Sequence, residues 1–147
     1  MSVAVYKEIP LSLDDGNQKR LFKLKLNLYT GSVRLEGGAI KRSIFLGRKM
    51  FNRLFQFMRN EYGFTLGRIL YKDRFMRNGH ATTSSNEHYR FTVQDEADIK
   101  VVVENEDFPA ERFTAIVPKT DATPESDILI PSVLAALIYR RDNDAAA

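Results

Sequence analysis

The sequence contains no cysteine, and this absence excludes several kinds of chemistry. Disulfide bonds, zinc sites built on thiolates and thiol catalysis are all ruled out, and a reducing compartment is compatible. No apolar run approaches the roughly 18 residues that a membrane-spanning helix needs. The first residues, MSVAVYKEIPL, lack the apolar segment of a signal peptide. We therefore expect a cytoplasmic protein with no membrane partner.

The motifs of common enzyme classes are also missing. There is no GxxxxGK[ST] phosphate-binding loop and no GxSxG nucleophile elbow. The two histidines are His80, in RNGHATTSS, and His88. A nuclease can use such a histidine as a general base, but neither stands in a recognisable site, and ENEDF at 104–108 is better interpreted as a solvated turn than as a metal cluster. We predict no catalytic residue, no metal site and no cofactor.

What the chain does have is a strongly uneven charge distribution. Residues 1–80 contain 16 Lys/Arg and 6 Asp/Glu, a net charge of +10, whereas residues 81–147 contain 6 and 13, a net charge of −7. Such a split indicates a half that faces a polyanion joined to an acidic half. The alternative is that the two halves only attract each other.

The first 63 residues predict four strands followed by a helix. In LFKLKLNLYT (21–30), apolar and polar residues alternate with the period of two that marks a strand with one dry face. Further strands are expected at 3–8, 32–36 and 39–46, with turns at Gly31-Ser32 and Gly37-Gly38. From Gly47 to Tyr62 the spacing of the apolar residues changes to that of an amphipathic helix, with Gly63 as its C-terminal cap. The apolar positions of this predicted helix are Phe51, Leu54, Phe55, Met58 and Tyr62.

The second half gives the same order. Strands are expected at 64–75, 88–94, 98–104 and 112–119, a polar loop at 77–87, and a closing helix within 128–141 that has Pro131 in its first turn. The fold class is therefore predicted as α+β, a single compact domain over residues 1–147 built from a basic ββββα unit (1–63) and a more acidic ββββα unit (64–147), each helix covering one face of its sheet.

This element order resembles the Whirly-type fold of single-stranded DNA- and RNA-binding proteins and the related tandem repeats of the PUR (purine-rich element-binding) family. The lysine-alternating strand, hairpins and aromatic-rich segment of FKLKLNLYTGSVRLEGGAIKRSIFLGRKMFNRLFQFMRNEYG are similar to a PUR repeat. The layout of HYRFTVQ, IKVVVE and RFTAIVP is similar to a Whirly second half. The lysine-rich motif of plant Whirly proteins is absent, so no individual residue is carried over. The resemblance implies single-strand binding in an oligomer.

The residues themselves agree with that implication in part. Single strands bind to basic surfaces that follow the phosphates and to aromatic rings on which bases stack. Two groups of outward side chains are candidates, the first on the early strands and the second near the start of the second half. The predicted nucleic-acid-binding residues are Lys23, Lys25, Tyr29, Arg34, Lys41, Arg42 and Phe45, together with Arg68, Lys72, Arg74 and Arg77. Structural roles are equally open, because exposed lysines also protect a sheet from aggregation.

We therefore predict a non-enzymatic protein that binds single-stranded DNA or RNA with little sequence preference. A homo-oligomer is expected, because open sheets leave edges to pair. The alternative is an interaction or inhibitor protein of the phage or plasmid type, whose acidic half, residues 95–111 above all, binds a basic protein partner.

Overall fold

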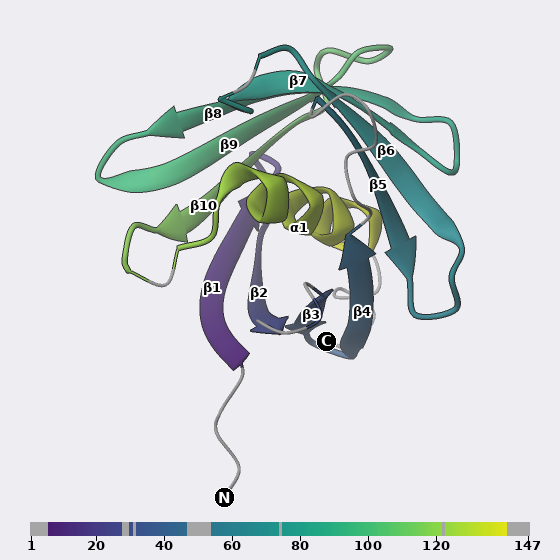
Figure 1. Ribbon diagram of the computed structural model, residues 1–147. Helices are drawn as coiled ribbons and strands as arrows, with labels where there is room; N and C mark the ends of the chain where they lie inside the picture. The colour runs from purple at the N-terminus through teal and green to yellow at the C-terminus, as the bar shows by residue number, and fades with distance from the viewer. Residues whose placement is uncertain are drawn as a thin grey trace, which may run out of the picture.

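The structure is a computed structural model that describes residues 6–27, 30, 32–46, 54–73, 75–121 and 123–140. Within these ranges the chain forms ten strands and one helix (Figure 1). The strands are β1 (Tyr6–Asp14), β2 (Lys19–Asn27), β3 (Ser32–Gly37), β4 (Ile40–Leu46), β5 (Phe55–Asn60), β6 (Thr65–Tyr71), β7 (Asn78–Thr83), β8 (His88–Asp95), β9 (Asp98–Asn105) and β10 (Arg112–Pro118), and the helix is α1 (Ser126–Ile138).

The ten strands form a closed antiparallel barrel with up-and-down order. Each strand pairs with the next one along the chain, and β10 pairs with β1, where Leu13 lies opposite Ala115. Closure leaves no sheet edge among these strands, which is how up-and-down barrels avoid edge-to-edge pairing. The predicted α+β fold of two ββββα units is therefore wrong, since strands from residues 1–63 and 64–147 share one barrel.

Helix α1 lies inside this barrel. Figure 1 shows it enclosed by the strands, with β1 to β4 along one side and β8 to β10 along the other, and it packs against β1, β3 and β4. Every residue from Leu129 to Leu137 is buried. A helix that is apolar all round needs protein on every side, and the barrel interior provides it. The helix predicted near the C-terminus is present, but it fills the barrel instead of covering a sheet face. Within the described residues, no helix is long and apolar enough to cross a membrane.

Pro131 lies further into α1 than predicted, because the helix begins at Ser126. Proline has no N–H, so it cannot bond the carbonyl four residues earlier, which belongs to Asp127. The side chain of Gln56 on β5 donates to that carbonyl instead, with Nε2 2.7 Å from the oxygen. The hydroxyl of Tyr71 on β6 in turn donates to Gln56 Oε1 at 2.7 Å. Two strands therefore hold the helix through one buried amide.

The described part of the helix predicted over 47–62 contains strand β5 and no helix. Residues 47–53 lie outside the described ranges, and 55–60 are strand. The period of two is hidden because polar Gln56 faces inward while Phe55 and Phe57 face outward, the reverse of the usual pattern. Gly63 caps no helix; it lies in the β5–β6 turn with a φ of +83°.

Strand β7 occupies part of the region predicted as a loop. Its inward positions carry small side chains, Gly79, Ala81 and Thr83. A Cβ atom on Gly79 would lie 2.3 Å from the carbonyl oxygen of Leu70 and 2.9 Å from Cζ of Phe91. Only a residue without a side chain fits against these neighbours, which is why the strand has so little apolar character in the sequence.

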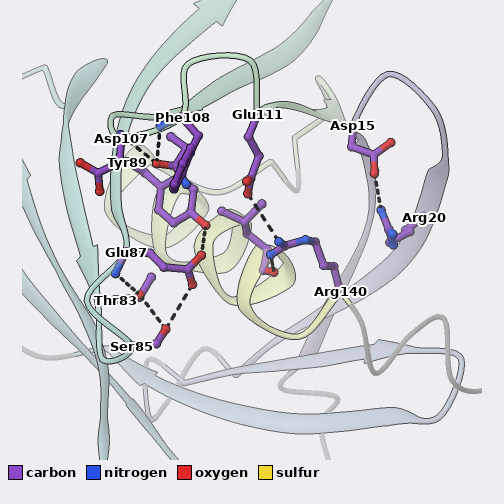
Figure 2. A network of polar contacts seen from close by, with 12 residues as sticks. Asp15, Arg20, Thr83, Ser85, Glu87, Tyr89, Asp107, Phe108, Glu111 and Arg140 are labelled. Atoms are coloured by element: carbon purple, nitrogen blue, oxygen red, sulfur yellow. Dashed lines mark hydrogen bonds and ion pairs between the residues drawn. The ribbon is translucent and has the colours of Figure 1, made fainter.

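Polar contacts gather at the end of the barrel where α1 ends (Figure 2). Arg140 donates to the carbonyl of Leu137 at 2.6 Å, stacks on Phe113 and approaches Glu111 at 3.5 Å. In the neighbouring hairpin, the Tyr89 hydroxyl donates to Glu87 at 2.8 Å, and burial raises the pKa of Tyr89. Arg140 therefore joins the end of α1 to the β9–β10 hairpin, and a separate contact lies within the β7–β8 hairpin.

Candidate nucleic-acid interface

Four of the predicted binding residues lie together on the outside of β2 to β4. Lys23 and Lys25 project from β2, and the register places Lys25 opposite Arg34. Lys41 on β4 completes the group, which is here called the lysine face. The sequence pattern therefore placed these side chains on one wet surface, as expected from the alternation.

The lysine face also carries two glutamates that the sequence analysis did not place. Glu36 is 3.2 Å from Lys25 Nζ and 3.1 Å from Arg34 Nε, and Glu8 is 3.8 Å from both Lys23 and Lys25. Partial burial opposes the ionisation of Glu36, but the hydrogen bond and charge of Lys25 outweigh it, and the pKa of Glu36 lies below its ordinary value. Much of the positive charge on this face is therefore balanced by its own carboxylates.

The remaining predicted residues are dispersed. Arg42 contacts Glu61 at 2.7 Å and stacks over Tyr139, which terminates α1. Arg77 lies 3.7 Å from Asp95, and Lys72 is exposed in the turn after β6. Tyr29 and Arg74 lie outside the described residues. Tyr71, the sequence neighbour of Lys72, is buried in the core.

A different surface combines arginine with aromatic rings, on the outside of β4 to β6. The register places Phe45 opposite Arg59 and Phe57 opposite Arg68, and Leu70 opposite Phe55. These six residues are here called the Phe/Arg face. The rings of Phe55 and Phe57 meet edge to face, with centroids 4.8 Å apart. Phe45 is 44% exposed and Leu70 is 50% exposed, so large apolar side chains face solvent here.

The arginines of this face differ from those of the lysine face. Arg59 and Arg68 are both exposed, and neither forms an ion pair with any residue that the structure describes. The Phe/Arg face therefore has two guanidinium groups available to an external anion, whereas most cations elsewhere on the strands are engaged.

A hollow of about 310 Å³ opens on this face, between β5, β6 and β7. Gly67 is part of its lining, and an added Cβ there would lie 2.9 Å from the carbonyl oxygen of Thr82. The β5–β6 register also shifts between Met58 and Arg59, a bulge of the kind often found beside functional sites. The lining consists of one ring, one guanidinium and small polar groups, without a carboxylate: Phe57, Thr65, Gly67, Arg68, Thr82, Thr83, Ser84 and Asn86.

No protein-family model, curated protein or solved structure matches this chain. The resemblance to Whirly and PUR proteins therefore stays a prediction from element order. The assignment of a Whirly-like fold is wrong, because the described strands close into one barrel around the helix.

A larger cavity, about 600 Å³, lies at the other end of the barrel beside the start of α1. Its walls mix charges of both signs. Asp95 lies 2.6 Å from Lys119 Nζ, and that hydrogen bond holds the pKa of Asp95 below its ordinary value. Because its lining contains the acidic residues Asp95, Glu125 and Asp127 as well as the basic Arg77 and Lys119, this cavity offers no clear preference for a charged ligand.

Carboxylates of the acidic half, residues 81–147, also contact side chains of the same chain. Glu104 lies 3.0 Å from Arg90 and 3.7 Å from Arg112, and Glu106 contacts the ring of His80. These carboxylates contact side chains of their own barrel, so the half that carries the net negative charge presents fewer free carboxylates than its composition indicates.

Sequence reasoning found Phe45 and Arg68 but missed the rest of the Phe/Arg face. Phe55 was assigned to the apolar side of a predicted helix, and Arg59 lies within that same predicted helix. The available signal was the run Phe55, Phe57 and Arg59 at every second position, which is a strand pattern with an aromatic outer face.

Proposed function

We propose that the protein binds single-stranded nucleic acid on the Phe/Arg face. The observation that carries the proposal is the hollow in which Phe57 and Arg68 lie side by side, lined without any carboxylate. A base stacks on an aromatic ring in such a site while a guanidinium neutralises the neighbouring phosphate. The cytoplasm, where the sequence predicts the protein to act, is the expected setting.

The polar rim of the hollow supports a nucleotide over an apolar peptide. Thr65, Thr82 and Ser84 contribute hydroxyl groups, and Asn86 contributes an amide. These groups donate and accept hydrogen bonds to base edges and to sugar or phosphate oxygens. Beyond the hollow, Phe45 and Arg59 repeat the pairing of ring and cation one step along the sheet, which suits a chain of nucleotides.

The test is the binding of a labelled single-stranded oligonucleotide to the full chain, followed by fluorescence anisotropy at two salt concentrations. Each stacked base contributes about 1–3 kcal/mol, so Phe57→Ala is expected to weaken binding about tenfold or more. Arg68→Gln is expected to weaken binding and to reduce the dependence of log K on log salt by about one.

Lys23→Gln provides the matched control, because it removes one cation from the lysine face at the same formal charge change. We expect it to leave affinity nearly unchanged, since Lys23 lies beside Glu8. If Lys23→Gln and Arg68→Gln lower the affinity equally, then the binding site is not confined to the Phe/Arg face. An absence of binding to single-stranded DNA and RNA alike would refute the proposed function.

A further inference from the structure

Both histidines of the chain lie on the outside of the barrel next to the hollow. The register places Thr82 of β7 opposite Arg68 on one side and opposite His88 on the other. In the next row of the sheet, His80 of β7 lies opposite Arg90 of β8. His80 and His88 are therefore diagonal neighbours on adjacent strands, a separation of about 7–8 Å that still allows two side chains to reach one group.

Each imidazole is held through its Nδ1 atom. His80 Nδ1 contacts the Glu106 carboxylate, and His88 Nδ1 lies 3.3 Å from Thr82 Oγ1. A carboxylate at Nδ1 accepts that N–H, so the neutral ring carries its free lone pair on Nε2. The side chain of His80 is 43% exposed, and no described residue bonds to Nε2 of either histidine. Both Nε2 atoms are thus available to a bound strand.

We propose that this pair cleaves single-stranded RNA at a phosphodiester held beside Arg68. The inference rests on the proposed function, because the strand must first bind on the Phe/Arg face. His80 is the general base, with Glu106 as the residue that positions its ring and stabilises the imidazolium that forms. His88 in its protonated form is the general acid, and the Arg68 guanidinium offsets the charge that develops on the phosphate oxygens.

The step needs no co-reactant. The 2′ oxygen of the ribose attacks the adjacent phosphorus while its proton passes to His80 Nε2. The bond from phosphorus to the 5′ oxygen of the next nucleotide breaks, and His88 gives its proton to that oxygen. The products are a 2′,3′-cyclic phosphate and a strand with a 5′ hydroxyl. The two histidines return to their starting states by exchanging protons with water.

Catalysis is not predicted from the sequence, because His80 and Glu106 are 26 residues apart. Only the pairing of β8 with both β7 and β9 brings them together, because Glu106 directly follows β9. The 2′ hydroxyl requirement also makes the inference specific, since DNA of the same sequence lacks the attacking group.

The experiment incubates the full chain with a labelled RNA oligonucleotide in the presence of EDTA, with the all-deoxy oligonucleotide in parallel. We expect RNA to be cut to products that end in a cyclic phosphate and DNA to stay intact. His80→Gln and His88→Gln are each expected to lower the rate by about 100-fold or more. Glu106→Gln is expected to lower kcat without raising KM. Binding of the deoxy oligonucleotide, measured on the same variants, should change less than twofold.

The outcomes separate the two proposals. Binding of both oligonucleotides without cleavage would overturn the RNA-cleavage inference and leave the proposed function standing. An absence of binding and of cleavage would overturn both. Cleavage that survives in the His80→Gln/His88→Gln double variant, purified in the same way, would come from a contaminant and overturn the inference. Equal cutting of DNA, or loss of cutting in EDTA, would overturn the 2′-hydroxyl mechanism.

Discussion

At the scale of single residues, Gly79 leaves less room for a side chain than Gly67, the glycine of the neighbouring strand β6. A Cβ on Gly79 meets two backbone atoms, the Leu70 oxygen at 2.3 Å and Tyr71 Cα at 2.9 Å, as well as the Phe91 ring. Backbone cannot move aside as a flexible side chain can. We expect Gly79→Ala to lower the free energy of unfolding by about 3 kcal/mol, measured by urea denaturation.

Gly63→Asn is the control for this substitution. No atom lies within 4 Å of a Cβ at Gly63, and asparagine tolerates its positive φ of +83° better than most residues do. We expect a change of about 0.5 kcal/mol or less. If Gly79→Ala is as mild as Gly63→Asn, then β7 does not pack against β6 and β8 as described.

The sequence correctly predicted that the lysine side chains of β2 point outward, but it did not predict which side chains lie beside them. The outward positions of Lys23 and Lys25 follow from a period of two that any strand imposes. Their neighbours Glu8 and Glu36 come from other strands, and only the register decides that they lie opposite. A charge count along the chain therefore overstated the free positive charge of this face.

At the scale of elements, the buried amide of Gln56 compensates for Pro131 in α1. It donates to the Asp127 carbonyl that the proline cannot bond, and it accepts from Tyr71. We expect Gln56→Leu to lower the free energy of unfolding by about 2 kcal/mol, because both hydrogen bonds are lost in a buried site. Urea denaturation of purified variants measures the change.

Making the Gln56→Leu substitution in a Pro131→Ala variant tests whether Gln56 acts in place of the N–H that proline lacks. Alanine restores a backbone N–H that can bond the Asp127 carbonyl within the helix. Gln56→Leu should then cost about 1 kcal/mol less than it does in the parent chain. The same cost in both backgrounds would show that Gln56 does not act in place of the missing N–H.

Gln56 and its neighbour Phe57 explain why β5 was predicted as a helix. An inward Gln56 and an outward Phe57 reverse the usual burial of a strand, so the apolar residues of β5 fell at helical spacing instead. The partner that makes an inward glutamine acceptable is a carbonyl 71 residues away. Seven of the ten strands have strong local patterns and were predicted, and the strand predicted at 3–8 overlaps β1 at residues 6–8. Strands β5 and β7 were missed, and both depend on distant partners.

At the scale of the whole molecule, closure of the barrel was not predictable from the strand pattern. With β5 taken as a helix and β7 as a loop, eight strands and two helices gave a repeat that does not exist. The apolar sequence of α1, ILIPSVLAALI, did carry a signal, since a helix without a polar face belongs in an interior. Closure also removes the free edges on which the expected homo-oligomer depended, and assembly stays a prediction.

The packing of α1 makes the two charged halves one folding unit. The helix belongs to the C-terminal half of the chain but packs against β1, β3 and β4 of the N-terminal half, and β1 pairs with β10. Neither half can bury its apolar face alone. We expect one cooperative unfolding transition in urea, with the same midpoint by far-ultraviolet circular dichroism and by tyrosine fluorescence.

Leu134→Ala extends this prediction to a single position. Leu134 is buried in α1, and its truncation should lower the free energy of unfolding by about 2–5 kcal/mol. If the barrel is one unit, both signals shift to the same lower midpoint, because the strands cannot persist once the helix that fills them is weakened. Two separate transitions, or a shift in one signal alone, would mean that the halves fold independently and that α1 does not hold them together.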